Sequence, residues 1–212
     1  MLPAMILDPQ PGEIVIDMCA APGSKASHLA QLMNNKGPLI LIDRNIKRIP
    51  ALEINLRRLG ITNSLILNFD STNLTKLNIK ANKILLDAPC TGEGLIRQDR
   101  SRKTSKTEKD LEKMGLIQKK LLKTGLKSLK PGGKLIYSTC SIAPEENELV
   151  INEVLQTLPN LSIIGIDKQY GIPGLTNVFN QDLISDLKLS QRLYPHIHDT
   201  IGFYLCLIKK EN

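Results

Sequence analysis

The sequence of 212 residues predicts a doubly wound α/β fold built on a mostly parallel β-sheet. Short apolar runs alternate with longer segments whose apolar residues have helical spacing. The apolar runs are continuous, as expected for strands that are covered on both faces of a sheet. Polar and small residues follow each run, at the edge where parallel α/β sheets bind their ligands.

The apolar runs mark five strands in the first two thirds of the chain. They lie at 14–16, 39–42, 65–67, 84–86 and 135–137. Helices are expected at 24–34, 46–59, 108–129 and 145–158. Gly60 is placed to end the second helix and Pro144 to begin the last, because glycine is favoured just after a helix and proline in its first turn.

The last third of the chain departs from this alternation. Residues 161–166 have the pattern of a strand, and an irregular stretch with Gly171, Pro173 and Gly174 follows. Residues 203–208 form a final strand without a long helix before it, so we expect it to pair antiparallel. The length suits one core, and we predict a single domain over residues 1–212.

The composition is that of a globular protein, with 42% hydrophobic and 23% charged residues. No apolar run approaches the roughly 20 residues that span a bilayer, and the N-terminus lacks the features of a signal peptide. We therefore expect a cytoplasmic protein that does not bind membranes. The four cysteines lack CxxC spacing and a histidine at metal-ligand spacing, so we expect free thiols and no metal site.

The positive charge is concentrated in one segment. Residues Arg97 to Lys134 contain 13 Lys and Arg against four Asp and Glu, whereas the rest of the chain carries 15 basic and 17 acidic residues. Such a segment suits a polyanion such as RNA, and a solvated helix face is the alternative. With no Trp, three Phe and four Tyr, recognition of RNA would depend on backbone charge and shape rather than on aromatic stacking.

The residues after the five predicted strands form a candidate nucleoside site. They are residues 17–25 (Asp-Met-Cys-Ala-Ala-Pro-Gly-Ser-Lys), Asp43, Asp70, residues 87–90 (Asp-Ala-Pro-Cys) and residues 138–141 (Ser-Thr-Cys-Ser). The first turn matches neither GxGxxG nor GxxxxGK[ST], which disfavours a dinucleotide or a triphosphate. Asp43 could accept hydrogen bonds from ribose hydroxyls and Asp70 from an adenine amino group. A helix-capping role is the alternative for either aspartate.

Two cysteines follow neighbouring strands of the predicted sheet, Cys90 after the fourth and Cys140 after the fifth. If those strands are adjacent, both thiols open into one cleft. Asp87 and Lys25 would add an acid and a cation, and a nearby cation lowers the pKa of a thiol. The alternative is that each cysteine is a small buried apolar residue.

Several of these segments resemble the motifs of one family. Residues 17–25, 87–94 (Asp-Ala-Pro-Cys-Thr-Gly-Glu-Gly), 137–141 (Tyr-Ser-Thr-Cys-Ser) and 144–148 (Pro-Glu-Glu-Asn-Glu), with Leu-Asp-Pro-Gln-Pro-Gly-Glu at 7–13, are similar in order and spacing to the Sun (Nol/Nop/Sun, RsmB-like) RNA 5-cytosine methyltransferases. The likeness covers residues 7–155 and resumes at 195–207. It implies a seven-stranded, Rossmann-like methyltransferase sheet with an antiparallel C-terminal strand, and S-adenosylmethionine as cofactor.

The resemblance also implies a covalent mechanism. Cys140 would add to C6 of the target cytosine, and C5 would then take the methyl group. Cys90 would assist loss of the C5 proton and release of the enzyme, while Asp87 and Lys25 would hold the base. Covalent activation is needed because cytosine C5 is otherwise a poor nucleophile. Thr-Cys beside Pro-Cys points to RNA, because DNA 5-cytosine methyltransferases place the nucleophile in Pro-Cys.

The cofactor contacts implied by the resemblance begin in the first turn. Its residues Cys19, Ala20, Ala21, Pro22, Gly23, Ser24 and Lys25 would hold the methionine and ribose region. Asp43 would hold the ribose, Asp70 the adenine, and Asp87 would face both ligands. Arg48 matches a basic family position near the cofactor, and a surface charge on the second helix is the alternative.

The likeness is incomplete at both ends. Family members carry substantial sequence before the Asp-Pro-Gln-Pro-Gly segment, so we expect a missing N-terminal region or a partner to supply part of the RNA-binding surface. Ser24 stands where many relatives have glycine, and residues 199–203 depart from the common Asp-Gly-Phe-Phe ending. Transfer RNA and ribosomal RNA both remain open as substrates. The compact chain favours transfer RNA, and its Ile- and Lys-rich composition suits an archaeal source.

Three other functions are compatible with parts of the sequence. They are a non-catalytic RNA-binding scaffold, a DNA or small-molecule methyltransferase, and a nucleoside-binding oxidoreductase. The cysteine pair, the Thr-Cys motif and the lack of GxGxxG, respectively, argue against them. His196 and His198 are expected to be structural or to lie at the RNA edge, and Cys19 and Cys206 are expected to pack.

Overall fold

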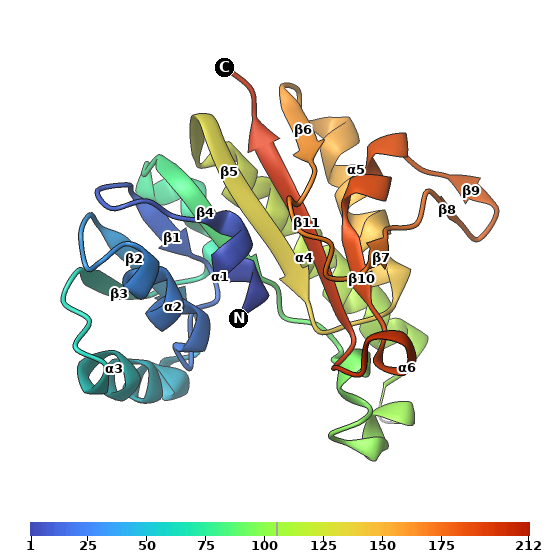
Figure 1. The fold of residues 1–212 in the computed structure, drawn as a ribbon, viewed down its shortest axis with the longest axis horizontal. Helices are drawn as coiled ribbons and strands as arrows, with labels where there is room; N and C mark the ends of the chain where they lie inside the picture. The colour runs from blue at the N-terminus through green and yellow to red at the C-terminus, as the bar shows by residue number, and fades with distance from the viewer. Residues whose placement is uncertain (105) are drawn as a thin grey trace. The chain divides into compact units, whose positions relative to one another are not determined.

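The computed structural model describes residues 1–104 and 106–212 (Figure 1). Its contacts divide the chain into two compact units. Unit 1 comprises Met1–Asp87, Thr124–Ile136 and Lys210–Asn212, and unit 2 comprises Ala88–Lys123 and Tyr137–Lys209. The division passes through helix α4 (Glu108–Lys127) and strand β5 (Leu129–Thr139). The single domain expected from the sequence stays a prediction.

Unit 1 is organised around parallel strands. Their hydrogen-bonded order is β3 (Ser64–Asn68), β2 (Leu39–Asp43), β1 (Val15–Asp17), β4 (Ala81–Asp87) and then β5. β1 pairs in parallel with β2 and β4, and β2 pairs in parallel with β3. All five residues of β2 are buried, as expected for a central strand. β3 lies at the edge, and its Leu65 is 55% exposed. All five strands predicted from apolar runs are present.

The helices of unit 1 differ from the prediction at two places. Helix α2 (Ser24–Leu32) begins where expected, but the predicted helix at 46–59 is divided into the 3-10 turn η1 (Ile46–Arg48) and α3 (Ile49–Arg58). Pro50 explains the division, because proline has no N–H and is tolerated only in the first turn of an α-helix. Gly60 follows α3 with a φ of +65°, as predicted. A short helix, α1 (Leu2–Leu7), was not predicted and packs on α2 and β4.

Unit 2 contains the antiparallel strands of the C-terminal third. β11 (Phe203–Lys210) pairs antiparallel with β10 (Gln191–Leu193), which pairs antiparallel with β7 (Ile172–Pro173). β6 (Leu161–Ile164) also pairs with β11. β8 (Asn177–Val178) and β9 (Gln181–Asp182) form a separate hairpin. The antiparallel C-terminal strand is confirmed, although β7 and β10 were missed because they are too short to form an apolar run.

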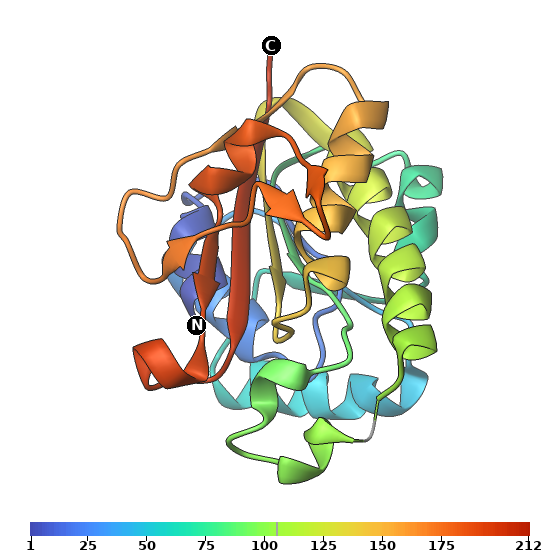
Figure 2. The same cartoon turned by 90° about the vertical axis from the view of Figure 1, so that its right-hand side faces the viewer.

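Helices α4 and α5 (Glu148–Thr157) run side by side in unit 2 (Figure 2), where Lys119 pairs with Glu153. The predicted helix at 145–158 begins instead as a 3-10 turn, η5 (Pro144–Glu146). Asn147, with φ −121° and ψ −98°, separates this turn from α5. Val150, Ile151 and Val154 form the buried face of α5. The smaller elements are η2 (Ser71–Leu77) in unit 1 and η3 (Glu93–Leu95), η4 (Arg100–Lys103), η6 (Ser185–Leu189) and α6 (Pro195–His198) in unit 2.

The fold class is the α/β class that the sequence predicts, with a mostly parallel sheet and antiparallel C-terminal strands. In the described part of the chain the sheet has nine strands rather than the seven expected. None of the described helices is long and apolar enough to cross a membrane.

Candidate functional site

The turn between β1 and α2 in unit 1 has the conformation that its small residues allow. Gly23 has a φ of +108°, which favours glycine over residues with a side chain. A Cβ atom at this position would lie 3.0 Å from Cδ1 of Leu52 in α3. The glycine is therefore required both by its backbone conformation and by the close approach of α3.

Hydrogen bonds from neighbouring elements hold the same turn in place. Oδ1 of Asp17 accepts from the backbone N–H of Cys19 at 3.2 Å, and Oδ2 of Asp43 accepts from that of Ala21 at 3.2 Å. The backbone N–H of Ala20 donates to Ile42 at 2.9 Å. The amide of Asn55 donates to the carbonyl of Pro22 at 2.9 Å. The turn is thus pre-formed, with the ends of β1 and β2 aligned on it.

Asp43 and Arg48 meet at the end of β2. Nη1 of Arg48 lies 3.3 Å from Oδ2 of Asp43, and its Nη2 donates to the carbonyl of Ala21. Oδ1 of Asp43 accepts from the backbone N–H of Asn45 at 2.9 Å, and Asn45 rather than Asp43 caps η1. Arg48 therefore supports the turn and is not an isolated surface charge. The predicted cofactor contacts of both residues stay predictions.

Asp70 lies two residues beyond β3 and is exposed. It caps η2, because its Oδ1 accepts from the backbone N–H of Thr72 at 2.9 Å and from the hydroxyl of Thr72 at 2.8 Å. The capping interpretation of this aspartate is confirmed. Its contact with an adenine stays a prediction.

Asp17, the last residue of β1, belongs to the candidate segment 17–25 but had no role of its own predicted from the sequence. The side chain is buried, and burial raises the pKa of its carboxyl to about 7. A strongly shifted acid beside a pre-formed turn is typical of functional sites, although structural acids show it too. An acidic residue at the end of a fully apolar strand was the available signal.

Lys25 and Asp87, which were expected to contribute a cation and an acid to one site, form an ion pair within unit 1. Nζ of Lys25 lies 2.7 Å from Oδ2 of Asp87, and the two side chains are 24% and 30% exposed. The pair joins the start of α2 to the end of β4. Because both side chains reach solvent, a ligand could contact either of them.

Cys90 and Cys140 meet in unit 2, as expected if their strands are neighbours. Their sulfur atoms lie 3.1 Å apart, and neither cysteine forms a disulfide bond. The hydrogen bond to Cys140 and burial raise the pKa of the Cys90 thiol well above its ordinary value. Cys90 therefore holds its proton at neutral pH. Cys206, which also lies in this unit and was expected to pack, is fully buried in β11.

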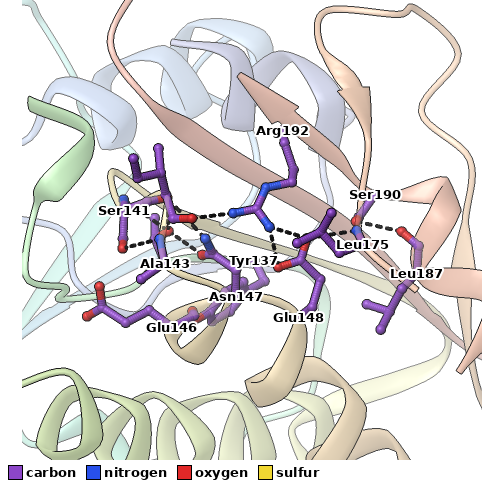
Figure 3. A network of polar contacts seen from close by, with 12 residues as sticks. Tyr137, Ser141, Ala143, Glu146, Asn147, Glu148, Leu175, Leu187, Ser190 and Arg192 are labelled. Atoms are coloured by element: carbon purple, nitrogen blue, oxygen red, sulfur yellow. Dashed lines mark hydrogen bonds and ion pairs between the residues drawn. The ribbon is translucent and has the colours of Figure 1, made fainter. Parts of the chain in front are cut away.

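Three consecutive polar residues near this pair are fully buried: Glu146, Asn147 and Glu148. In Figure 3 their side chains point in different directions. Glu148 pairs with Arg192, with Nη1 at 2.9 Å and 2.8 Å from the two carboxylate oxygens. This segment belongs to a motif quoted from the sequence, but no role was predicted for it. A run of polar residues before an apolar helix was the available signal of its buried contacts.

Several residues of the basic segment have partners within unit 2. Arg97 pairs with Asp199 at 2.7 Å, and Arg102 donates to the carbonyl of Thr91 at 3.1 Å. Ser105 of this segment lies outside the described residues. Nδ1 of His198 accepts from the backbone N–H of Tyr194 at 2.9 Å, which supports the structural role predicted for that histidine.

Two further features lie apart from the predicted residues. A surface cavity of about 520 Å³ in unit 1 is lined by residues of α2 together with Met1, Leu59 and Ile61, and it includes none of the predicted cofactor residues. Among the described residues, no group of three or more His, Cys, Asp and Glu side chains is arranged to hold a metal ion.

Comparison with known proteins places this geometry in a family. Residues 4–209 match the model for the 16S rRNA methyltransferase RsmB/F. The 26S rRNA (cytosine-C(5))-methyltransferase nsun-1 of Caenorhabditis elegans is 41% identical over 99% of this chain, which spans 32% of that protein. The tRNA (cytosine(72)-C(5))-methyltransferase of Pyrococcus horikoshii is 37% identical over 99% of this chain, which spans 50% of it.

Solved structures agree with this assignment. A methyltransferase homologue from Pyrococcus horikoshii superposes with a TM-score of 0.88 and 44% identity, covering 98% of this chain and 65% of the other. The structure of NSun6 from Pyrococcus horikoshii with SFG has a TM-score of 0.86 and 36% identity, covering all of this chain and 51% of the other.

Proposed function

Because the chain belongs to the RsmB/F methyltransferase family, we propose that it transfers a methyl group from S-adenosylmethionine to C5 of a cytosine in RNA. The two thiols 3.1 Å apart, which come from the Pro-Cys and Thr-Cys motifs, carry this proposal. A 5-cytosine transfer needs a nucleophile for C6 and a group that accepts the C5 proton, and this pair supplies one thiol for each task.

In the proposed reaction, the Cys140 sulfur forms a bond to C6 of the cytosine. The electron pair of the C5–C6 double bond then attacks the methyl group. The bond between the methyl group and the cofactor sulfur breaks, and its electrons stay on that sulfur. Loss of the C5 proton restores the double bond and breaks the bond between C6 and Cys140. Cytosine C5 is too weak a nucleophile to react before C6 has been attacked.

Cys90 serves the second half of this reaction. The raised pKa of Cys90 disfavours its thiolate in the resting protein, so the role of attacking nucleophile suits this thiol less well. Before the C5 proton is lost, the Cys90 thiol would give its own proton to solvent water, and a thiolate whose conjugate acid has a raised pKa is the stronger base for the C5 proton. Transfer of that proton to Cys90 would leave Cys140 free to depart from C6.

The turn after β1 is the proposed cofactor cradle. Cys19, Ala20, Ala21, Pro22, Gly23 and Ser24 offer backbone groups already held in position by Asp17 and Asp43. S-adenosylmethionine supplies an electrophilic methyl group when it is bound there. We assign the ribose to Asp43 with Arg48 nearby, and the adenine to Asp70, whose carboxylate also caps η2.

Lys25 and Asp87 are assigned to the base. Their ion pair places the lysine against a carboxylate that can accept a hydrogen bond from the exocyclic amine of cytosine. The lysine charge would offset the negative charge that develops on the base as sulfur adds to C6.

The substrate is proposed to be transfer or ribosomal RNA, the two substrates in the names of the relatives above. The target base must leave its stack to reach a thiol. The basic segment Arg97 to Lys134 is proposed to bind phosphates around it. A region outside this chain, or a partner, is proposed to complete the RNA-binding surface.

The test is to replace each cysteine separately with alanine and to incubate the variants with cofactor and total RNA. On a denaturing gel, Cys90→Ala should accumulate a protein–RNA adduct, because release is blocked. Cys140→Ala should form neither adduct nor methylated RNA. Methylation by Cys140→Ala would reverse the two roles and favour the arrangement of DNA enzymes. RNA binding without any methyl transfer by the unaltered protein would favour a non-catalytic scaffold.

A further inference from the structure

We infer that Glu146 and Asn147 are positioning residues that fix the two thiols relative to each other. Glu146, with Gln118, holds the loop of Cys90, and Asn147 holds the loop of Cys140. This inference rests on the proposed function for its catalytic consequence. The geometric basis of the inference is independent of the proposed function. The two adjacent side chains lie fully buried in unit 2 and make their polar contacts with different loops.

Glu146 holds the loop of Cys90. Its Oε1 accepts from the backbone N–H of Thr91 at 2.9 Å, and its Oε2 accepts from the Thr91 hydroxyl at 2.6 Å. Both carboxylate oxygens are thus directed at the residue that follows Cys90. The hydroxyl of Tyr137 donates to the carbonyl of Glu146 at 2.6 Å, which fixes the backbone from which the carboxylate extends.

Gln118 of α4 closes the other side of the same loop. Its Nε2 donates to the carbonyl of Pro89 at 2.8 Å and to Oε1 of Glu146 at 3.1 Å. The residues on either side of Cys90 are therefore tied to one buried carboxylate, directly or through one amide. Such a network leaves the Cys90 backbone little freedom, because each buried group would be unpaired if the loop moved.

Asn147 holds the loop of Cys140 in the same manner. Its Oδ1 accepts from the hydroxyl of Thr139 at 2.6 Å, and its Nδ2 donates to the carbonyl of Ser141 at 3.0 Å. The contact with Ser141 is visible in Figure 3. These two partners precede and follow Cys140, so one amide side chain bridges the loop that carries the proposed nucleophile.

The break between η5 and α5 allows adjacent residues to reach different loops. Consecutive side chains of a regular helix point about 100° apart, so they rarely all face buried polar partners. Asn147 leaves the helical conformation, with φ −121° and ψ −98°, between the 3-10 turn and α5. Glu146 extends toward residues 89–91 and Asn147 toward residues 139–141, while one peptide bond joins them.

This arrangement bears on the reaction because the thiols are 50 positions apart in the sequence and 3.1 Å apart in space. One backbone hydrogen bond, from the N–H of Gly94 to the carbonyl of Cys140 at 2.9 Å, also joins the two loops. Reactive groups lose about 10²-fold in rate when they are displaced by roughly 1 Å. Because Glu146 and Asn147 each fix one loop, replacing either residue would affect the catalytic step that depends on the cysteine of that loop.

The test uses Glu146→Ala and Asn147→Ala, with Cys90→Ala and Cys140→Ala as references. Matched controls are Glu145→Ala, the neighbouring glutamate, and Asn152→Ala, a buried asparagine of α5 whose Oδ1 accepts from the backbone N–H of Ile184. Glu146→Ala should accumulate the RNA adduct as Cys90→Ala does. Asn147→Ala, combined with Cys90→Ala so that the adduct is retained, should lower adduct formation by about tenfold or more, as expected when buried hydrogen bonds that orient the nucleophile are lost.

Two nearly isosteric variants guard against loss of folding. Thr91→Val removes only the hydroxyl that meets Glu146, and Thr139→Val only the hydroxyl that meets Asn147. They should reproduce the two opposite phenotypes in weaker form. The conservative variant Glu146→Gln, which keeps an acceptor for the backbone N–H of Thr91, should restore release in part.

A readout without RNA separates this inference from the proposed function. Iodoacetamide labelling followed by peptide mass spectrometry should show faster alkylation of Cys90 in Glu146→Ala and of Cys140 in Asn147→Ala, each by about tenfold. Equal changes in the alkylation rates of both cysteines in either variant would overturn the inference. So would the same RNA phenotype from Glu146→Ala and Asn147→Ala, if Cys90→Ala and Cys140→Ala differ from each other. Failure of Cys90→Ala to trap an adduct would instead count against the proposed mechanism, and the labelling result would still decide the positioning role.

Discussion

The sulfur atoms of Cys90 and Cys140 lie 3.1 Å apart within unit 2, although the two residues belong to different motifs. Each cysteine loop is held by its own buried side chain, Glu146 for the first and Asn147 for the second. The corresponding part of unit 1 is the turn after β1, which is held by Asp17 and Asp43. The cysteine loops of unit 2 and the turn of unit 1 are therefore each pre-formed by buried polar contacts, and the energetics of these contacts can be measured.

Replacing Lys25 by Met should remove charge from the proposed base site without unfolding the protein. The pair with Asp87 is partly exposed, so its loss should shift the melting temperature by no more than about 4 °C. Methyl transfer should fall about 10²-fold, the usual effect of losing one group that offsets developing charge. Lys36→Met, at an exposed lysine of the same unit, is the control. Equal activity of the two variants would rule out the assigned role.

Asp17→Asn should change how stability depends on pH. Burial raises the folded-state pKa of Asp17 to about 7, above the ordinary value of about 3.8 in the unfolded chain. Between these values the folded state holds a proton that the unfolded state has lost, so stability falls as pH rises from about 4 to about 7. The variant lacks this loss and should gain up to roughly 4 kcal/mol relative to the native protein across that range. Urea unfolding at pH 4, 5.5, 7 and 8 measures the difference, and parallel curves would contradict the assignment.

Arg192→Met should be strongly destabilising. Arg192 and Glu148 are 2% and 0% exposed, and removal of one partner leaves a buried carboxylate unpaired at a cost of about 3–5 kcal/mol. Burial raises the pKa of Glu148 while Arg192 opposes that rise, so the variant should also become more stable relative to the native protein as pH falls.

The exposed pair of Arg97 with Asp199 provides the control for this experiment. Its side chains are 48% and 91% exposed, and Arg97→Met should change the free energy of unfolding by no more than about 1 kcal/mol. Chemical denaturation of both variants at pH 7 is the measurement. Similar values for the two would show that the Arg192 pair contributes no more than a surface contact.

Gly23→Ala should disturb the turn after β1. The residue has a φ of +108°, and an added Cβ would lie 3.0 Å from Leu52, so a destabilisation of roughly 1–3 kcal/mol is expected. Cofactor binding, measured by calorimetry, should weaken because the turn is the proposed cradle. Gly165→Ala is the control, since an added Cβ there meets no atom within 4 Å. Unchanged cofactor affinity in a folded Gly23→Ala variant would remove this turn from the site.

Much of the fold could be predicted because its signals are local. The five apolar runs of the first two thirds each became a strand, and Gly60 ends α3 as its position indicates. The misassigned helix boundaries lie at Pro50 and Asn147, where the backbone leaves the α-helical pattern while the apolar spacing continues. The short strands β7 and β10 carry no periodic signal, because two or three residues cannot display one.

The candidate site was predicted less evenly. The meeting of Cys90 with Cys140 was expected from strand ends that share one edge, and Lys25 and Asp87 were expected in one site, where they form an ion pair. Gln118 was missed, and Asp17 and the buried segment Glu146-Asn147-Glu148 were quoted within motifs without a role of their own. Their polar side chains are significant because they are buried and paired, and burial cannot be read from residue type alone.

The order of strands and helices and the motifs at the strand ends could be predicted from the residues alone, because apolar spacing and turn residues act over a few positions. Which distant groups meet is a property of the folded chain. Thr91 and Glu146 are 55 positions apart, and Glu148 and Arg192 are 44 apart. Contacts of this kind depend on how whole elements pack, because a buried polar side chain must find its partners wherever the fold brings them.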